Sequence, residues 1–177
     1  MNWDEVEQTL FRAALTAMQR FASRHADETF YGFSFDCNAD YGEVLLCLNS
    51  EKALAEWARR HYPSYSQEEI DRELRWNSGD WKYQGFNQGE DYAQAWEKVW
   101  GPTQEKIHAA YLEAADEEAD EFLEILLESV CRVLLRMERE NVFAGLNKEP
   151  HFKALVTNHD ELLEDAWERL EVVRNAS

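Results

Sequence analysis

Six side chains of the kinds that bind partners or move protons gather at two turns of the chain. The first turn spans residues 38–42, and the second is the Asn-Ser-Gly-Asp run at 77–80. Tryptophan beside ionisable groups on loops is typical of a protein-binding hot spot. In the alternative interpretation, the tryptophans pack on a sheet and an Arg–Asp ion pair ties the loop. The candidate partner-binding residues are Asp40, Tyr41, Arg75, Trp76, Asp80 and Trp81.

No pattern of a catalytic or cofactor site accompanies these residues. The chain has 7 Gly and contains neither a phosphate-binding glycine loop nor a nucleophile elbow, and its 5 His form no zinc-binding motif. His159-Asp160 follows an expected strand and allows two interpretations, an acid/base pair or a turn beside a helix cap. Cys37 is a poor nucleophile because Asp36 and Asp40 would raise its pKa. We expect no cofactor and no metal, and the sequence favours a non-enzymatic protein without deciding the question.

The balance of charge predicts which partners the protein attracts. The chain has 36 acidic and 18 basic residues, for a net charge of −18. Such a field repels phosphate backbones and anionic membranes but speeds the encounter with a basic protein. High solubility is the other explanation of an acidic chain. We therefore expect no nucleic-acid or membrane partner, and a basic protein as the candidate partner.

Acidic residues concentrate in one stretch, with no Lys or Arg between Lys106 and Arg132. The stretch either docks a cationic partner or is a solvated helix face whose charges complement the helix dipole. It lacks the Asp-x-Asp-x-Asp-Gly spacing of a calcium loop. Its members are Glu113, Asp116, Glu117, Glu118, Asp120, Glu121, Glu124 and Glu128.

Length and cysteine content indicate a globular protein from a reducing compartment. The 177 residues suit one domain spanning 1–177, and 45% of them are hydrophobic. Three cysteines, Cys37, Cys47 and Cys131, form no C-x-x-C motif and predict no disulfide framework. The start of the chain lacks a secretion signal, and no apolar run approaches the roughly 20 residues that span a bilayer. Cytoplasm is the expected location.

Periodicity predicts an α+β fold in which a small, mostly antiparallel sheet packs against several helices. Residues 3–25 show helical spacing, and 29–49 read as a hairpin with Tyr31, Phe33, Phe35 and Cys37 on one buried face. Its return strand, 43–49, is apolar on both faces and is therefore expected at the centre of the sheet. Later segments give a capped helix from Ser50 to Pro63, a short helix behind the capping box at 66–69, and a strand pair or structured loop at 75–83.

The second half of the chain reads as helical except for one strand. A helix at 90–100 should end at Gly101-Pro102. The pattern from 103 to about 140 would span about 55 Å as one helix, so a break is expected near 115–119. Residues 122–137 are apolar on most of their circumference and should form the central core helix. A short strand at 152–156 and a final helix capped at 158–160 complete the prediction.

The same segments resemble a known family. Asp40-Tyr41-Gly42 in a hairpin, the run from Leu74 through Trp81, and the strand leading to Asn158-His159-Asp160 are similar to the bacterial family called domain of unknown function 4303. The resemblance implies no established activity or cofactor. Members are similar to small acidic proteins found beside bacterial toxins, which implies, by analogy, an immunity role.

Three hypotheses of function follow from the sequence. The first is a protein-binding module, with an immunity protein against a basic toxin as its specific form. The second is a small-molecule binder or enzyme that uses Asp40, Trp76, Asp80 and Trp81, which requires a concave pocket and shifted carboxylate pKa values there. The third is a dimer that buries apolar residues of the long helix. The oligomeric state does not follow from the sequence.

Overall fold

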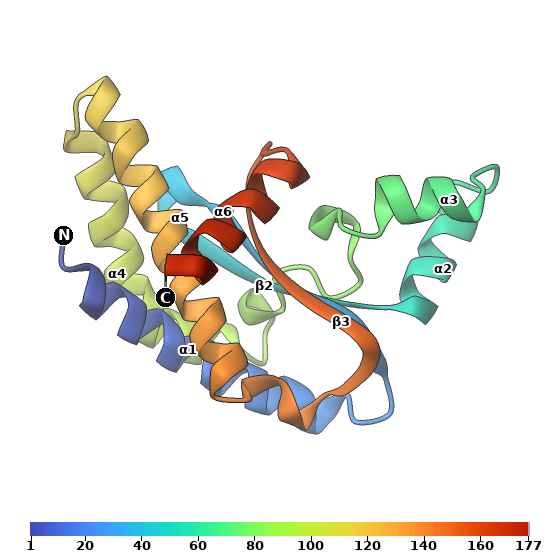
Figure 1. The fold of residues 1–177 in the computed structure, drawn as a ribbon. Helices are drawn as coiled ribbons and strands as arrows, with labels where there is room; N and C mark the ends of the chain where they lie inside the picture. The colour runs from blue at the N-terminus through green and yellow to red at the C-terminus, as the bar shows by residue number, and fades with distance from the viewer. Residues whose placement is uncertain (177) are drawn as a thin grey trace.

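The computed structural model describes residues 1–176, and it describes the side chains of all of these except 116 and 117. It is an α+β protein with a three-stranded sheet, as expected (Figure 1). The principal elements are α1 (Trp3–Arg24), β1 (Thr29–Asn38), β2 (Glu43–Ser50), α2 (Glu51–His61), α3 (Gln67–Glu69), α4 (Ala93–Glu113), α5 (Asp116–Arg139), β3 (Asn147–Asn158) and α6 (Leu163–Ala176).

The sheet is mixed, with strand order β2-β1-β3. The expected hairpin is present, because β1 and β2 pair antiparallel, but β3 lies parallel to β1. The parallel pair follows from the long helical crossover between β2 and β3. The prediction that 43–49 is central was wrong, since β1 holds that place. Burial of both faces makes β2 apolar on both sides even though it lies at the edge of the sheet.

A bulge in β1 changes the predicted face of Tyr31. Phe30 pairs with Ser50 and Gly32 pairs with Asn49, so two steps along β1 match one step along β2. Phe33, Phe35 and Cys37 share one core as expected, but Tyr31 is buried in a separate cluster on the other face. The extra residue breaks the alternation that placed Tyr31 with the others.

Helices α1, α4 and α5 cover the face of the sheet that carries Phe33 and Phe35 (Figure 1). Residues 122–137 lie within α5, and Val130, Leu134 and Met137 are fully buried, which agrees with a central core helix. The break near 115–119 is confirmed to within a residue, because α4 ends at Glu113 and α5 begins at Asp116.

The prediction that a helix ends at Gly101-Pro102 was wrong, because α4 continues through both residues. Pro102 removes one helical hydrogen bond, a cost that burial on either side offsets. Trp96 and Trp100 before the proline and Ile107 after it belong to one core cluster, and the Trp100 indole donates to the Gly42 carbonyl at 3.1 Å.

The opposite face of the sheet is covered by α2 and by the segment from α3 to about residue 84. The predicted capping box is confirmed: the Ser66 hydroxyl accepts from the Glu69 N–H, and the Glu69 carboxylate accepts from the Ser66 N–H. Residues 75–83 are a structured loop, with a 3-10 turn at 78–80 and a single bridge between Tyr83 and Leu48. In the part of the chain that the structure describes, no helix is long and apolar enough to cross a lipid bilayer.

Asn87 stands in for a neighbouring strand along β2. Its amide oxygen accepts from the Leu46 N–H at 2.7 Å, and its amide nitrogen donates to the Val44 carbonyl at 3.0 Å. The side chain is fully buried. Because unpaired backbone groups are costly when buried, this contact lets an edge strand lie inside the protein.

We predict that Asn87→Ala lowers the free energy of unfolding by about 2–4 kcal/mol, since two buried backbone groups lose their partners. Gln88→Ala is the matched control, because Gln88 is exposed and its side-chain amide donates to the Glu43 carboxylate rather than to the backbone of β2. Its effect should stay within about 0.5 kcal/mol. Urea unfolding followed by tryptophan fluorescence measures both, and equal effects of the two substitutions would contradict this role of Asn87.

Candidate functional site

Two of the predicted tryptophans lie against a glycine of the central strand. A Cβ atom on Gly32 would meet the Trp76 ring at 2.9 Å and the Trp81 ring at 3.0 Å. The bulge turns Tyr31 to the same face, where its ring packs edge-on against both indoles. Gly32 is therefore required by the close approach of these rings.

Arg75 ties this aromatic group to the neighbouring helices. Its guanidinium pairs with Glu51 at 2.6 Å and Asp71 at 2.8 Å, and it lies over the Tyr31 ring at 4.8 Å. Its backbone carbonyl accepts from the Tyr31 hydroxyl at 2.7 Å and from the Trp81 indole at 3.0 Å. These contacts give Arg75 the structural role weighed for it above.

Asp40 and Tyr41 do not join this group. They form a 3-10 turn between β1 and β2 and contact α4: the Asp40 carbonyl lies 2.7 Å from His108 Nδ1, and the Tyr41 ring stacks on the same imidazole. Tyr41 is 58% exposed. The two turns therefore form separate features of the surface.

The loop from Arg75 to Gln84 is a ridge between two hollows. On one side, Asp80, Trp81 and Trp57 line a pocket of about 430 Å³. On the other, Trp76 lines a pocket of about 440 Å³, and Gly79 borders both. Trp81 is only 4% exposed, so Trp76 is the indole that a ligand reaches more easily. Of the six predicted residues, four are brought together in this loop: Trp76 lines one pocket, Asp80 and Trp81 line the other, and Arg75 lines neither.

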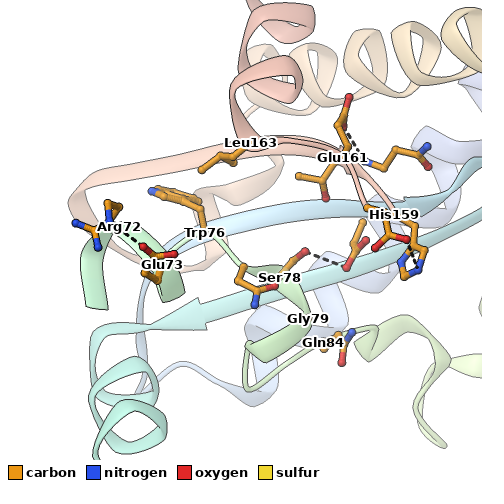
Figure 2. A pocket seen from close by; sticks show the side chains of 14 residues that line it. Arg72, Glu73, Trp76, Ser78, Gly79, Gln84, His159, Glu161 and Leu163 are labelled. Atoms are coloured by element: carbon orange, nitrogen blue, oxygen red, sulfur yellow. Dashed lines mark hydrogen bonds and ion pairs between the residues drawn. The ribbon is translucent and has the colours of Figure 1, made fainter. Parts of the chain in front are cut away.

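The pocket beside Trp76, called here the strand-end pocket, forms where β1 and β3 end (Figure 2). Parallel strands bring their carboxyl ends to one edge, a common position for binding sites in such sheets. Two hydrogen bonds hold this edge together: the His159 N–H donates to the Cys37 carbonyl at 2.8 Å, and the Ala39 N–H donates to the Asn158 side chain at 3.1 Å. The complete lining is Asp36, Arg72, Glu73, Trp76, Asn77, Ser78, Gly79, Gln84, Thr157, Asn158, His159, Asp160, Glu161 and Leu163.

Ion pairs at the rim of the strand-end pocket are exposed. Arg72 pairs with Glu73 at 2.8 Å, and His159 lies 3.5 Å from Asp160. Both members of the His159–Asp160 pair are mostly open to water, so the pair considered for acid/base work has no desolvated environment. Figure 2 shows the dashed line that joins Arg72 to Glu73.

Two carboxyl groups lie deeper in the strand-end pocket. Glu161 pairs with Arg169, whose side chain is only 8% exposed, and also accepts from the Asn158 N–H at 2.9 Å. Burial raises the pKa of Asp36, and the hydrogen bond that its carboxylate accepts from the Ser78 hydroxyl at 2.9 Å opposes that effect.

Trp76 is the one lining residue that the site prediction included, and Asp36, Ser78 and Glu161 are among those that it missed. Asp36 reads as a solvent-facing position of an alternating strand, and Ser78 reads as a turn residue. The one sequence signal for this pocket was the pair of carboxylates in His159-Asp160-Glu161, which follow a predicted strand and could have pointed to Glu161. Among the described side chains, no group of three or more His, Cys, Asp or Glu is placed to hold a metal ion.

The acidic stretch forms the exposed face of the first half of α5. Glu118, Asp120, Glu121 and Glu124 are exposed, while Glu128 pairs with Arg132 at 3.4 Å. The side chains of Asp116 and Glu117 lie outside the described residues. Burial raises the pKa of Glu161, while the Asn158 N–H and Arg169 oppose that rise, and Glu124 of α5 has the smallest effect.

The fold and site define a class of α+β proteins: a mixed three-stranded sheet with a helical layer and an acid-lined pocket at the ends of its parallel strands. The chain matches the family described as domain of unknown function (DUF4303) over residues 8–172, and it belongs to that family. No curated protein and no solved structure matches the chain.

We predict that Asp36→Asn raises Tm at pH 7. Because burial holds the pKa of Asp36 above its ordinary value, the native protein loses stability relative to this variant as the pH rises through that pKa. An asparagine oxygen can still accept from Ser78 without a buried charge. The difference in Tm should shrink below about pH 3.8, where the native carboxyl group is neutral in both the folded and the unfolded state.

Calorimetric scans of both proteins between pH 3 and 8 measure this difference. Ser78→Ala is the matched control of opposite sign, because it removes the hydroxyl donor that favours the ionised carboxylate. A lower Tm for Asp36→Asn than for the native protein at pH 7 would contradict the argument.

Proposed function

We propose that this protein is a non-enzymatic protein-binding module for one basic protein, and that it acts as an immunity protein neutralising a basic toxin in the cytoplasm. The observation that carries the proposal is the set of exposed acidic side chains on the first half of α5, in a chain of net charge −18. Complementary fields of this kind speed encounter and exclude partners of like charge.

The unpaired state of the acids on α5 supports a docking role. Among the described side chains, Glu118, Glu121 and Glu124 make no ion pair with a basic residue, in contrast to Glu128. Charges that no internal partner neutralises remain available to a basic surface. A solvated helix face explains their exposure equally well, so the test must separate binding from solubility.

The cysteines support the cytoplasmic part of the proposal. Cys37, Cys47 and Cys131 are all unpaired and buried. Burial raises the pKa of Cys47 and of Cys131 to about 12, which leaves both thiols protonated at neutral pH. Buried free thiols suit a reducing compartment.

The strand-end pocket and the raised pKa of Asp36 favour a second candidate, a small-molecule binder. Of the four residues predicted for such a site, only Trp76 lines the strand-end pocket. Asp40 lies elsewhere, and Asp80 and Trp81 line the other pocket. Binding of a small metabolite at Trp76, with no protein partner captured, would favour it over the first.

We predict that the tagged protein captures one basic protein from its native host at low salt and releases it in a salt gradient. Raising the salt from about 0.05 M to 0.5 M should weaken the affinity at least about tenfold, because screening shortens the range of the field. Mass spectrometry identifies the captured protein, and calorimetry with the purified pair measures the affinity.

Two triple variants with equal net charge separate a docking face from general acidity. Substituting Gln at Glu118, Glu121 and Glu124 should slow association about three- to tenfold. The control places Gln at Glu5, Glu90 and Glu105, which are exposed residues outside the first half of α5. Equal association rates for the two variants would show that α5 is only a solvated surface.

A further inference from the structure

The four carboxylates of the strand-end pocket differ in what neutralises them. Glu73 has Arg72 and Glu161 has the buried Arg169, whereas Asp160 has the exposed imidazole of His159, which is a cation only when it is protonated. Asp36 makes no ion pair within the described part of the chain; its side chain accepts a hydrogen bond from the uncharged hydroxyl of Ser78, and His159 acts on it without forming an ion pair. The pocket thus contains one half-buried carboxylate that has no ion-pair partner.

The surroundings of Asp36 favour a cation brought by a ligand. Asp36 is half-buried on β1, and a carboxylate that has lost much of its water gains most from a charged hydrogen-bond donor. Glu161 is not free to take that donor, because Nη2 of Arg169 is paired with it while Nε and Nη1 of Arg169 are buried without other partners. Removing Glu161 from Arg169 would leave a buried charge unpaired, which is strongly unfavourable.

Trp76 supplies an aromatic wall in the same pocket. Its ring is held by edge contacts with Tyr31 and Trp167, and Trp76 lines the same pocket as Asp36. An indole is the best aromatic partner for a cation, and a guanidinium can also stack on it as a plane. A guanidinium binds a carboxylate in a two-point contact, whereas an ammonium group acts as a point charge.

We propose that the strand-end pocket receives the guanidinium of an arginine side chain, which pairs with Asp36 and lies against Trp76. The inference rests on the proposed function in one respect, that the arginine belongs to the basic protein partner. Charge complementarity supports this source, because a chain of net charge −18 attracts a basic protein.

The chemistry of the pocket is tested on the purified protein with N-ethylguanidinium as the probe. We expect it to shift the NMR signal of the Trp76 indole N–H saturably, with a Kd of about 10 mM or below. N-ethylurea, which has nearly the same shape and no charge, should cause no saturable shift. The Trp76 signal is assigned from its loss in Trp76→Phe.

Two substitutions locate the cation. Asp36→Asn should weaken N-ethylguanidinium binding at least about tenfold, and its spectrum shows directly whether the protein is folded. Asp80→Asn is the matched control, since Asp80 belongs to the same loop but lines the other pocket. Equal binding of N-ethylurea, or unchanged binding to Asp36→Asn, overturns the proposal.

The second arm uses the basic protein captured in the salt-gradient experiment. Asp36→Asn and Trp76→Ala should each raise the dissociation rate of that complex about tenfold or more, while Asp80→Asn leaves it unchanged. If the native protein captures its partner but Asp36→Asn binds it as tightly, the arginine assignment is wrong and the proposed function stands. Failure of the native protein to capture any basic protein contradicts the proposed function, and N-ethylguanidinium binding then assigns the pocket to a free guanidine compound.

Discussion

The bulge at Tyr31 in the central strand is the constraint on which both halves of the structure depend. It sends Phe30 and Phe33 into the core beneath α1 and α5, while Tyr31 and Gly32 both serve the opposite face. A shift of one residue exchanges the two faces of a strand. Without the extra residue, Phe30 and Phe33 could therefore not both lie in the core while Gly32 lies on the opposite face. The bulge therefore gives one short strand two different cores.

The face of β1 that carries Tyr31 and Gly32 explains why the strand-end pocket exists. Next along this face of β1 after Gly32 come Ser34 and Asp36, whose side chains are too small to fill the space beneath the loop at 75–84. Trp76 and Trp81 occupy the room above Gly32, and the hollow over Asp36 stays open between that loop and the end of β3. The same polar residues that make the strand look solvent-facing in the sequence thus form the wall of a partly desolvated site.

The acidic character of the protein has two distinct physical parts. Many carboxylates are compensated within the fold, as for Glu51 and Asp71 with Arg75 or Glu161 with Arg169. Others, on the first half of α5, have no basic neighbour among the described residues and supply the long-range field. Net charge alone cannot distinguish the two parts, since it counts a paired carboxylate and a free one equally.

Local patterns in the sequence determined the elements. Helical periodicity gave α1, α5 and α6, the Ser66–Glu69 spacing gave the capping box, and alternation with turn residues gave the β1–β2 hairpin. These features depend on neighbours within a few residues. The central place of β1, the parallel β3, the continuation of α4 through Pro102 and the turn of Tyr31 depend on contacts between distant segments. Only the tertiary structure decided that Asp36 and Ser78 meet, and that Asp40 lies apart from Trp76, because 42 residues separate the first pair and burial by unrelated segments sets the positions of all four.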